Sequence, residues 1–515
     1  MARRFFLLIP LVILLSLAQP TLAAGPHFAA DIDPRVLEDL ASGSAHLIIR
    51  LKDLPAGLAV LSAGDLMRDR VANRVSDLRQ AAGFTQASLL GELRAQGKTY
   101  HSYWIVNAIA VEADPALLAQ LAARPDVLSI ESDRSFQVAL ESPPSTTSTT
   151  TGSANQPGLS LVKAPSLWVL GVRGQGMVVA SADTGVEWQH PALISQYRGW
   201  NGSSADHNYN WWDAIHGPIE PYSTSNPCGY TSSIPCDDFG HGTHTTGTMI
   251  GSTGTANQIG MAPDATWMAC RNMDHGWGSS STYIECLQFF IAPTDLAGNN
   301  PDPARRPHII DNSYNCPLLE GCQADSLHAA IQEVRSAGIF MAVSAGNDGN
   351  NLNDGSACKT IAFPPANEAG VFTVGGVEPV PYSQDIAVYS RSSRGPVVTN
   401  GPTFLKPDLA APAFNVMSSV QGGGYAPMNG TSMAAPHVAG GVALLWSAIP
   451  SLQRQVSETE ALLRQSAVPL PVIETCGGLP AGVVPNNTTG WGLLNVYAAY
   501  LEKMPNLTYF PVMAH

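Results

Sequence analysis

The sequence predicts an α/β protein with a doubly wound, mainly parallel sheet, preceded by a small α+β unit with a ferredoxin-like order of elements. Strand-like and helical segments alternate through the larger, C-terminal part of the 515-residue chain, as in parallel sheets whose strands are joined by helices. A polar stretch without charged or aromatic residues separates this part from the smaller one. The length also exceeds that of one ordinary domain, so two or more units are expected.

The first 24 residues have the pattern of a secretory signal peptide. Arg3 and Arg4 give a basic start, residues 5–17 are apolar, and small residues follow where cleavage is expected. The apolar run is too short to span a membrane comfortably, and no later segment reaches about 18 uninterrupted apolar residues. We therefore expect a secreted, extracellular protein with no membrane partner.

Residues 25–141 form the predicted small unit. Their apolar pattern gives the order βαββαβ, which is the ferredoxin-like arrangement. The expected elements are a strand at 45–52, a helix within 64–97, two strands within 100–114 that join near Asn107, a helix at 115–124 and a strand at 127–133.

Residues 142–157, "SPPSTTSTTTGSANQP", are expected to form a flexible linker that proteases can cut. They contain no charge, no aromatic residue and almost nothing apolar. Such a segment buries too little apolar surface to offset the entropy lost when a chain becomes ordered.

Residues 158–500 form the predicted larger unit, and residues 501–515 a C-terminal tail. In doubly wound sheets the functional site lies at the carboxyl ends of the strands, and Asp183 and Asn347 stand at two such ends. The expected strands lie within 176–186, 308–314, 338–347 and 371–377, and the expected helices within 325–338 and 433–449.

Ser432 stands at the start of an apolar helical stretch, in "NGTSMAAPHVAGG". Serine caps helices because its oxygen accepts otherwise unpaired N–H groups, so a capping role is one interpretation. The other interpretation is chemical, because the first turn of a helix stabilises negative charge and small neighbours leave the hydroxyl open. A nucleophilic role requires a base elsewhere in the chain.

His241 is the candidate base, in "DDFGHGTHTTGTMIG". Gly240 and Gly242 flank it, so we expect its ring to be accessible. The alternatives are an ordinary loop histidine, or a metal pair with His244, which could share a helical face with it. No carboxylate follows at the spacing of helical zinc motifs, so metal ligation is disfavoured.

Asp183 and Asn347 complete a possible catalytic set. Asp183 could accept the ring N–H of His241 and stabilise the imidazolium, and the Asn347 amide could donate to a developing oxyanion beside the Ser432 N–H. Each could instead be an ordinary turn residue.

The chain order Asp, His, Ser is that of subtilisin, and at this point a family resemblance is plain. "DTGV", "HGTH", "AGN" and "GTSMAAPHVAG" resemble the signature blocks of the subtilisin-like serine proteases, the subtilase or S8 family. "IGMAPDATWMACRNMD", "SSRGP" and "LKPDLAAP" also resemble the family, in particular its bacillopeptidase F-like branch. Residues 45–138 are similar to the family's inhibitor-type propeptide.

The resemblance implies a secreted endopeptidase that is made as a self-processing precursor. Asp183, His241 and Ser432 correspond to the catalytic triad, Asn347 to the oxyanion-hole residue, and His244 to a second, non-catalytic histidine. The edges of the substrate cleft would be Asn312, Ser313, Tyr314 and Asn315 on one side and Ser344, Ala345 and Gly346 on the other.

The expected partners are protein or peptide substrates and the chain's own propeptide, with the enzyme a monomer. No cofactor or catalytic metal is expected. Some relatives bind calcium at the segment that corresponds to "GSTGTANQIG", but Gly254 stands there where a side-chain ligand would help, so structural calcium is not supported.

Charge and cysteine content narrow the function further. The net charge of −14 lies mostly in the larger unit, which disfavours binding to nucleic acid or anionic lipid. Eight cysteines fit an oxidising compartment. Spacing suggests local bridges Cys228–Cys236 and Cys316–Cys322, although eight cysteines allow 105 pairings.

Two alternatives belong to other classes. An inert binding protein on the same fold would be expected to lack a triad residue, and none is lacking. An acid-acting sedolisin-type peptidase shares "GTS" but uses a Glu–Asp pair with its serine and an aspartate at the oxyanion position, so His241 and Asn347 argue against it.

Overall fold

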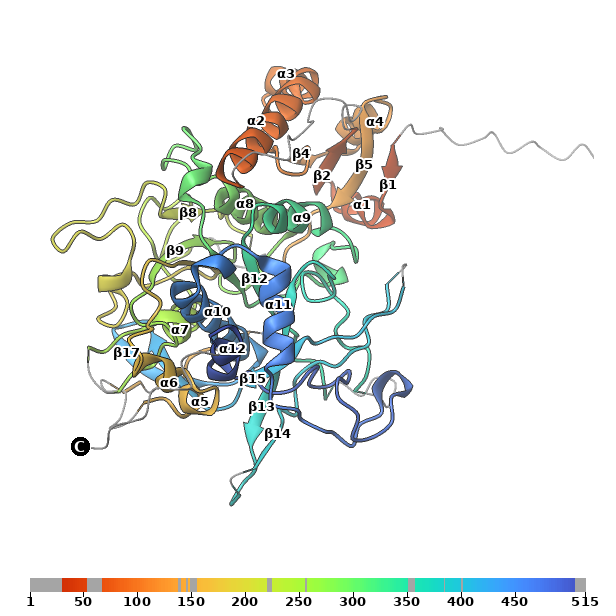
Figure 1. Cartoon of the computed structure of the whole chain (residues 1–515). Coiled ribbons are helices and arrows are strands. Elements are labelled where there is room, and N and C mark those ends of the chain that lie inside the picture. The colour runs from red at the N-terminus through yellow and green to blue at the C-terminus, as the bar shows by residue number, and fades with distance from the viewer. Residues whose placement is uncertain are drawn as a thin grey trace, which may run out of the picture.

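The computed structural model has two units that lie against each other (Figure 1). It describes residues 30–52, 67–137, 140–144, 147–148, 155–219, 225–254, 257–350, 357–383, 385–399 and 402–504. The expected signal peptide and the end of the expected tail lie outside the described residues. The division of the chain at residues 141 and 157 stays a prediction.

The N-terminal unit is a five-stranded sheet in the order β1-β5-β2-β4-β3, antiparallel except between β1 and β5. Its elements follow one another as the sequence pattern predicts, with a short first strand and helix added. The strands are β1 (Asp31–Ile32), β2 (Ala45–Leu51), β3 (Tyr100–Tyr103), β4 (Ala108–Ala113) and β5 (Val127–Ser132), and the helices are α1 (Pro34–Asp39), α2 (Met67–Thr85), α3 (Ala87–Ala95) and α4 (Pro115–Ala122).

The single helix expected within 64–97 is divided at Gln86, between α2 and α3. Gln86 is buried, and its Nε2 donates to Tyr103 O and to Asn107 Oδ1, both at 3.2 Å. These bonds tie the break between the helices to the turn between β3 and β4.

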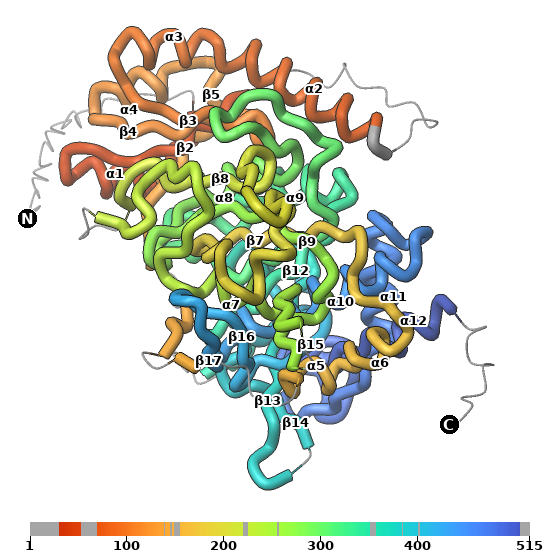
Figure 2. Tube along the Cα trace, turned by 90° about the vertical axis from the view of Figure 1, so that its left-hand side faces the viewer, coloured from red at the N-terminus to blue at the C-terminus, as the bar shows by residue number. Residues whose placement is uncertain are grey.

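Alternating side chains of β2 face two different cores. Leu47 and Ile49 pack with α3 and α4, whereas Ile48 belongs to a cluster that contains Val71 of α2 and Phe289 of α8 (Ser280–Ile291). Since successive strand residues point to opposite faces, one face of the sheet packs against α3 and α4. The other face, together with α2, meets the larger unit. Both views show the N-terminal unit over α8 and α9 (Figure 2).

The larger unit contains a central, mainly parallel sheet, which confirms the predicted fold class. The order is β14-β13-β12-β11-β7-β9-β8, with β15 also paired to β13, and only β14 is antiparallel. The strands are β7 (Val178–Asp183), β8 (Trp211–Asp213), β9 (Thr266–Arg271), β11 (Ile309–Asn312), β12 (Phe340–Ser344), β13 (Phe372–Pro379), β14 (Ile386–Val388) and β15 (Leu409–Pro412).

Helices cover both faces of this sheet. Val179 of β7 packs in the cluster that holds the inner side of α10 (Thr431–Ala448), and Ala180 packs in the cluster of α8 and α9 (His328–Ser336). The remaining helices are α5 (Pro157–Leu161), α6 (Ala164–Trp168), α7 (His241–Ile250), α11 (Val456–Gln465) and α12 (Val496–Lys503). Two short strand pairs, β6 (Phe136–Gln137) with β10 (Trp277–Gly278) and β16 (Val416–Val420) with β17 (Gly424–Met428), lie outside the sheet.

Short 3₁₀ turns connect several of these elements. They are η1 (Leu40–Ser42), η2 (Ile194–Gln196), η3 (Pro303–Arg305), η4 (Leu318–Glu320), η5 (Pro450–Leu452) and η6 (Cys476–Gly478). Helix α5 begins at Pro157, the last residue of the expected linker, and α12 ends at Lys503, within the expected tail.

All eight cysteines are paired in disulfides. Cys228–Cys236 and Cys316–Cys322 confirm the two local bridges expected from spacing. Cys270–Cys286 joins β9 to α8, and Cys358–Cys476 joins residues 118 positions apart. Among the described residues, no helix is both long and apolar enough to cross a bilayer.

Candidate active site

Asp183 and His241 meet at the carboxyl end of the central sheet. Asp183 is the last residue of β7, and His241 is the first of α7. The His241 Nδ1 lies 2.8 Å and 2.9 Å from the two Asp183 carboxylate oxygens, and both side chains are fully buried. Asp183 also accepts from the Thr184 N–H at 2.7 Å and from Thr245 Oγ1 at 3.2 Å. These bonds fix the carboxylate, so it holds the imidazole in one orientation.

The expectation that the His241 ring would be accessible is wrong for this form of the chain. A Cβ on Gly242 would lie 2.1 Å from Gly185 O, and one on Gly240 would lie 2.7 Å from Pro143 Cγ. The two glycines therefore allow other parts of the chain to approach the histidine closely, and these parts bury it.

Asp237 holds the start of α7, a role that the sequence reasoning missed. Its Oδ1 accepts from the Gly240 N–H at 2.7 Å, and its Oδ2 accepts from Thr243 N at 2.8 Å and Thr243 Oγ1 at 2.6 Å. Burial raises its pKa, although these bonds oppose the shift. The only signal in the sequence is an acidic residue four positions before His241, which is typical of many helix starts.

His244 is a structural residue here. Its Nε2 lies 2.9 Å from Val416 O and 3.2 Å from Ala426 O, so it donates to the backbone of the β16–β17 pair. Burial, together with the nearby His241, lowers its pKa to about 3. Among the described residues, no cluster of three potential metal ligands includes either histidine.

Ser432 is the second residue of α10, and the N-cap position belongs to Gly430. A helix-capping role for Ser432 is therefore wrong. Its backbone N–H lies among the first four of the helix, which no helical carbonyl can reach. Its Oγ donates to Ser313 O at 3.2 Å, and His241 Nε2 has no hydrogen-bond partner in the described part of the chain. Ser432 Oγ and His241 Nε2 therefore do not form a nucleophile–base hydrogen bond in this structure.

Pro436, the sixth residue of α10, has no backbone N–H to donate within the helix. The absent donor would otherwise bond to the carbonyl of Ser432, four residues earlier. Ser313 replaces it, because its Oγ donates to Ser432 O at 3.1 Å.

Asp311 is the other hydrogen-bond partner of the Ser313 hydroxyl. Its Oδ2 lies 2.8 Å from Ser313 Oγ. Full burial raises the pKa of Asp311 well above its usual range, and the nearby Asp183 charge adds to the shift. A protonated Asp311 carboxyl would donate to Ser313 Oγ and leave the single Ser313 hydroxyl hydrogen for the Ser432 carbonyl.

Asn347 follows β12 and lies directly against the start of α10. Its Oδ1 accepts from the Thr431 N–H at 2.9 Å and from Thr431 Oγ1 at 3.1 Å. Thr431 Oγ1 in turn receives the Gly346 N–H at 3.1 Å. Because Thr431 holds the amide oxygen, the Nδ2 group keeps its donors for another acceptor beside the Ser432 N–H.

The residues expected to edge the substrate cleft are mostly buried. Asn312, Ser313 and Tyr314 are buried, the Tyr314 hydroxyl donates to Asn312 Oδ1 at 3.2 Å, and its ring stacks on Tyr283. Asn315 is half-buried, and Ser344, Ala345 and Gly346 are buried. Their part in substrate binding stays a prediction.

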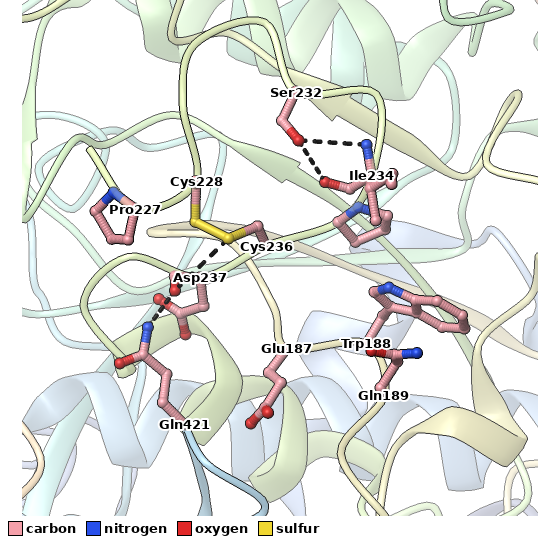
Figure 3. Close-up of a pocket in the computed structure, with 11 residues that line it drawn as sticks. Glu187, Trp188, Gln189, Pro227, Cys228, Ser232, Ile234, Cys236, Asp237 and Gln421 are labelled. Carbon is pink, nitrogen blue, oxygen red and sulfur yellow. Dashed lines mark hydrogen bonds between the residues drawn. A yellow bond between two sulfur atoms is a disulfide. The ribbon is translucent and has the colours of Figure 1, made fainter. Parts of the chain in front are cut away.

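A cavity of about 470 Å³ opens beside α7 (Figure 3). The Cys228–Cys236 disulfide lines it, and Gln421 Nε2 donates to Asp237 O at its edge. The Glu187 and Asp237 carboxylates make its lining acidic. The other lining residues are Trp188, Gln189, Pro227, Ser232, Ile234 and Pro235.

Three groups of potential metal ligands occur among the described residues. Cys316 and Cys322, grouped with Glu320, are bonded to each other. Asp238, grouped with Asp274 and His275, faces the Arg271 guanidinium at 3.2 Å. His101, His216 and Glu285 form the third group, in which the imidazoles stack and Glu285 already accepts from His216 at 2.7 Å. None of these groups includes Asp183 or Ser432.

Comparison with known proteins decides the family. The sequence model of the subtilase family matches residues 174–492. The chain belongs to the subtilase family. The resemblance inferred from the four sequence blocks is thereby confirmed, and the matched region of this subtilase is a serine endopeptidase domain with the α/β subtilisin fold.

This subtilase is similar to three proteins of Bacillus subtilis (strain 168). It is 34% identical to Bacillopeptidase F over 456 residues, which are 85% of this chain and 29% of that protein. It is 28% identical to Subtilisin E over 356 residues, 69% of this chain and 74% of that protein. Identity to the Major intracellular serine protease is 27% over 327 residues, 62% of this chain and 85% of that protein. The chain thus spans under a third of the length of Bacillopeptidase F.

Proposed function

We propose that this subtilase is a secreted endopeptidase that cleaves proteins through an acyl-enzyme on Ser432, with His241 as general base and Asp183 as its partner. The observation that carries the proposal is the paired Asp183–His241 contact, at 2.8 Å and 2.9 Å, together with a serine at the second position of α10. The signal-peptide pattern and four disulfides support secretion.

Each residue has a defined task in this mechanism. Ser432 Oγ attacks the carbonyl carbon of the scissile bond while His241 Nε2 accepts its proton, and His241 then passes that proton to the leaving amine. Asp183 stabilises the imidazolium. Asn347 Nδ2 and the Ser432 N–H stabilise the oxyanion, and water releases the acyl group. We propose that this monomeric enzyme needs no cofactor and no metal in these steps.

The N-terminal unit acts as propeptide and inhibitor in this proposal. Its Tyr103 hydroxyl donates to Glu285 of α8 at 3.3 Å, and the Trp104 and Ile105 N–H groups donate to Gln288 of α8 at 2.7 Å and 3.2 Å. These contacts, with the apolar cluster shared by the two units, support a unit that covers the enzyme until processing separates them.

A fluorophosphonate probe tests the nucleophile. We expect one covalent label, which mass spectrometry places on Ser432, and no label in the Ser432→Ala or His241→Ala variants. Ser203→Ala, at an exposed serine, is the matched control and should label normally. Labelling of another serine, or full hydrolysis by Ser432→Ala, would contradict the proposal, and a folded protein with no label and no hydrolysis would favour the inert binding protein.

Self-processing has its own test. The Ser432→Ala precursor, expressed in a protease-deficient host, should stay uncut between residues 139 and 158, because loss of a triad nucleophile lowers kcat by about 10⁶-fold. Added active enzyme should then convert it. A mature-sized product cut at the parental bond without added enzyme would show that another protease does the processing.

A further inference from the structure

A segment from the N-terminal part of the chain lies against Gly240, the residue before His241. At one end, β6 pairs antiparallel with β10, with Gln137 opposite Trp277. At the other end, the Ser148 N–H donates to Tyr425 O at 2.9 Å, and the Tyr425 N–H donates to Ser148 O at 2.8 Å, next to the strand that leads to α10. Residues 140–144 lie in the chain between these two ends, and the structure describes them.

Two described residues between these ends, Leu140 and Pro143, show where this segment lies. Leu140 is half-buried and packs against the hydrophobic cluster to which Tyr314 and Ala345 belong. Pro143 lies against Gly240, the residue before His241, because a Cβ there would come within 2.7 Å of Pro143 Cγ. Pro143 therefore places this segment beside the start of α7.

Glu141 lies between these two residues and is paired with Arg391. The Arg391 Nη1 is 3.0 Å from Glu141 Oε1, and the two side chains are 38% and 30% exposed. Glu141 is the only charged residue of the sequence between Arg134 and Lys163.

Arg391 belongs to the wall that carries Asn347. The Gly349 N–H donates to Arg391 O at 2.9 Å, and the Ser393 N–H donates to Gly346 O at 2.9 Å, so residues 391–393 run beside residues 346–349. Asp348 also faces Arg391, whose charge opposes the rise that burial causes in the pKa of Asp348. Arg391 therefore offers a positive charge at the residue that follows Leu140.

We propose that the Leu140–Glu141 peptide bond is the one that the enzyme cuts in its own precursor, and that Arg391 selects an acidic residue on the leaving side of the bond. This inference rests on the proposed function. Ser432 Oγ forms an ester with the Leu140 carbonyl carbon, and the bond to Glu141 N breaks. His241 delivers to that nitrogen the proton taken from Ser432, and water then converts the ester to the Leu140 carboxylate and restores the serine.

The same selection extends to substrates of the mature enzyme. Internally quenched peptides with the sequence Gln-Val-Ala-Leu-X-Ser-Pro-Pro, where X is Glu, Gln or Lys, measure it directly. We expect cleavage after Leu, with kcat/KM higher for Glu than for Gln by about two- to fivefold, as for a partly exposed ion pair. Because Lys would repel Arg391, Glu should exceed Lys by about tenfold.

Variants of Arg391 test whether this residue causes the preference for Glu. Arg391→Gln should abolish it and Arg391→Glu should reverse it toward Lys, while Arg305→Gln, a surface arginine 53% exposed, should leave it unchanged. In the precursor, Glu141→Lys should slow processing, and Arg391→Glu in the same chain should restore it. This pair keeps the test valid if one Arg391 variant folds poorly.

Cleavage at a different bond, or an unchanged preference in Arg391→Gln, would overturn this inference while leaving the proposed function intact. Absence of any Ser432-dependent hydrolysis would instead refute the proposed function, and the inference with it.

Discussion

Hydrogen bonds from residues distant in the sequence hold Ser432 at the start of α10. Thr431 and Asn347 fix one side of the helix start at 2.9 Å and 3.1 Å, and Ser313 satisfies the carbonyl that Pro436 leaves without a helical donor. The small residues after Ser432 let the helix lie close to these partners. The position of Ser432 therefore depends on hydrogen bonds made by the residues around it.

Asn347→Ala should lower kcat by roughly 10²- to 10³-fold with little change in KM, the usual loss for one oxyanion-hole donor. The physical reason is that the Nδ2 donors act on charge present only in the transition state. Steady-state kinetics on a slow amide substrate measures the effect. A kcat close to that of the parent enzyme would show that Asn347 does not act in the oxyanion hole.

Asp311→Asn should stabilise the protein at pH 8 and not at pH 4. Burial raises the folded-state pKa of Asp311, so the unfolded chain releases this proton first, and the contribution of the protonated form to stability is lost as pH rises above the unfolded value. An asparagine keeps the donor to Ser313 Oγ without that loss. In a Ser432→Ala background, a rise of about 1 kcal/mol raises Tm by about 2–4 °C. If Asp311 is ionised in the folded protein, Asp311→Asn should instead lower the Tm at pH 8.

At the scale of elements, α7 and α10 approach their neighbours through glycines. A Cβ on Gly440 of α10 would lie 2.4 Å from Met261 Cβ and 2.7 Å from Met249 O, so the helix rests almost directly on the end of α7. A Cβ on Gly247 of α7 would lie 2.1 Å from Ser419 Oγ of β16. These approaches hold α7 close to α10 on one side and to β16 on the other.

Gly440→Ala should destabilise the catalytic domain by up to about 2 kcal/mol. Alanine gains about 1 kcal/mol in helix propensity, but overlap with a backbone carbonyl costs about 1–3 kcal/mol because the backbone cannot move aside. Gly441→Ala is the matched control, since the nearest atom to its Cβ would be a side-chain methyl, Val496 Cγ1 at 2.8 Å, and not a backbone carbonyl. Thermal unfolding in the Ser432→Ala background compares them. Equal effects of the two substitutions would contradict the packing argument.

Across the whole molecule, buried histidines make the stability of the fold depend on pH. Three histidines are held neutral: burial lowers the pKa of His244 and His308 to about 3 and that of His437 to about 4. His308 joins β11 to β7, because its Nδ1 accepts the Val178 N–H at 3.0 Å. Below about pH 6.5 the unfolded chain therefore binds protons on these histidines that the folded protein does not bind.

Acid should destabilise the protein between about pH 6.5 and 4. The folded pKa of these histidines lies below the unfolded value of about 6.5, so their contribution is present above pH 6.5 and is lost as pH falls. Each should contribute about 1.4 kcal/mol per pH unit to the slope. His308→Asn, whose amide oxygen can still accept from Val178, should lower the slope by about that amount. Urea unfolding at several pH values measures it, and an unchanged slope would mean that His308 is not held neutral.

The sequence by itself determined the alternation of strands and helices, two of the four disulfides, the family and the residues that carry the proposed chemistry. Local periods and motifs encode these features, because neighbours along the chain suffice to define them. Only the tertiary structure decided that Gly240 and Gly242 serve close packing, that Ser313 replaces the donor missing at Pro436, and that Glu141 meets Arg391. The last two pairs lie 119 (Ser313 to Ser432) and 250 positions apart in the sequence. No local pattern specifies such partners, since they meet only when the sheet, the helices and the segment that contains Glu141 are packed together.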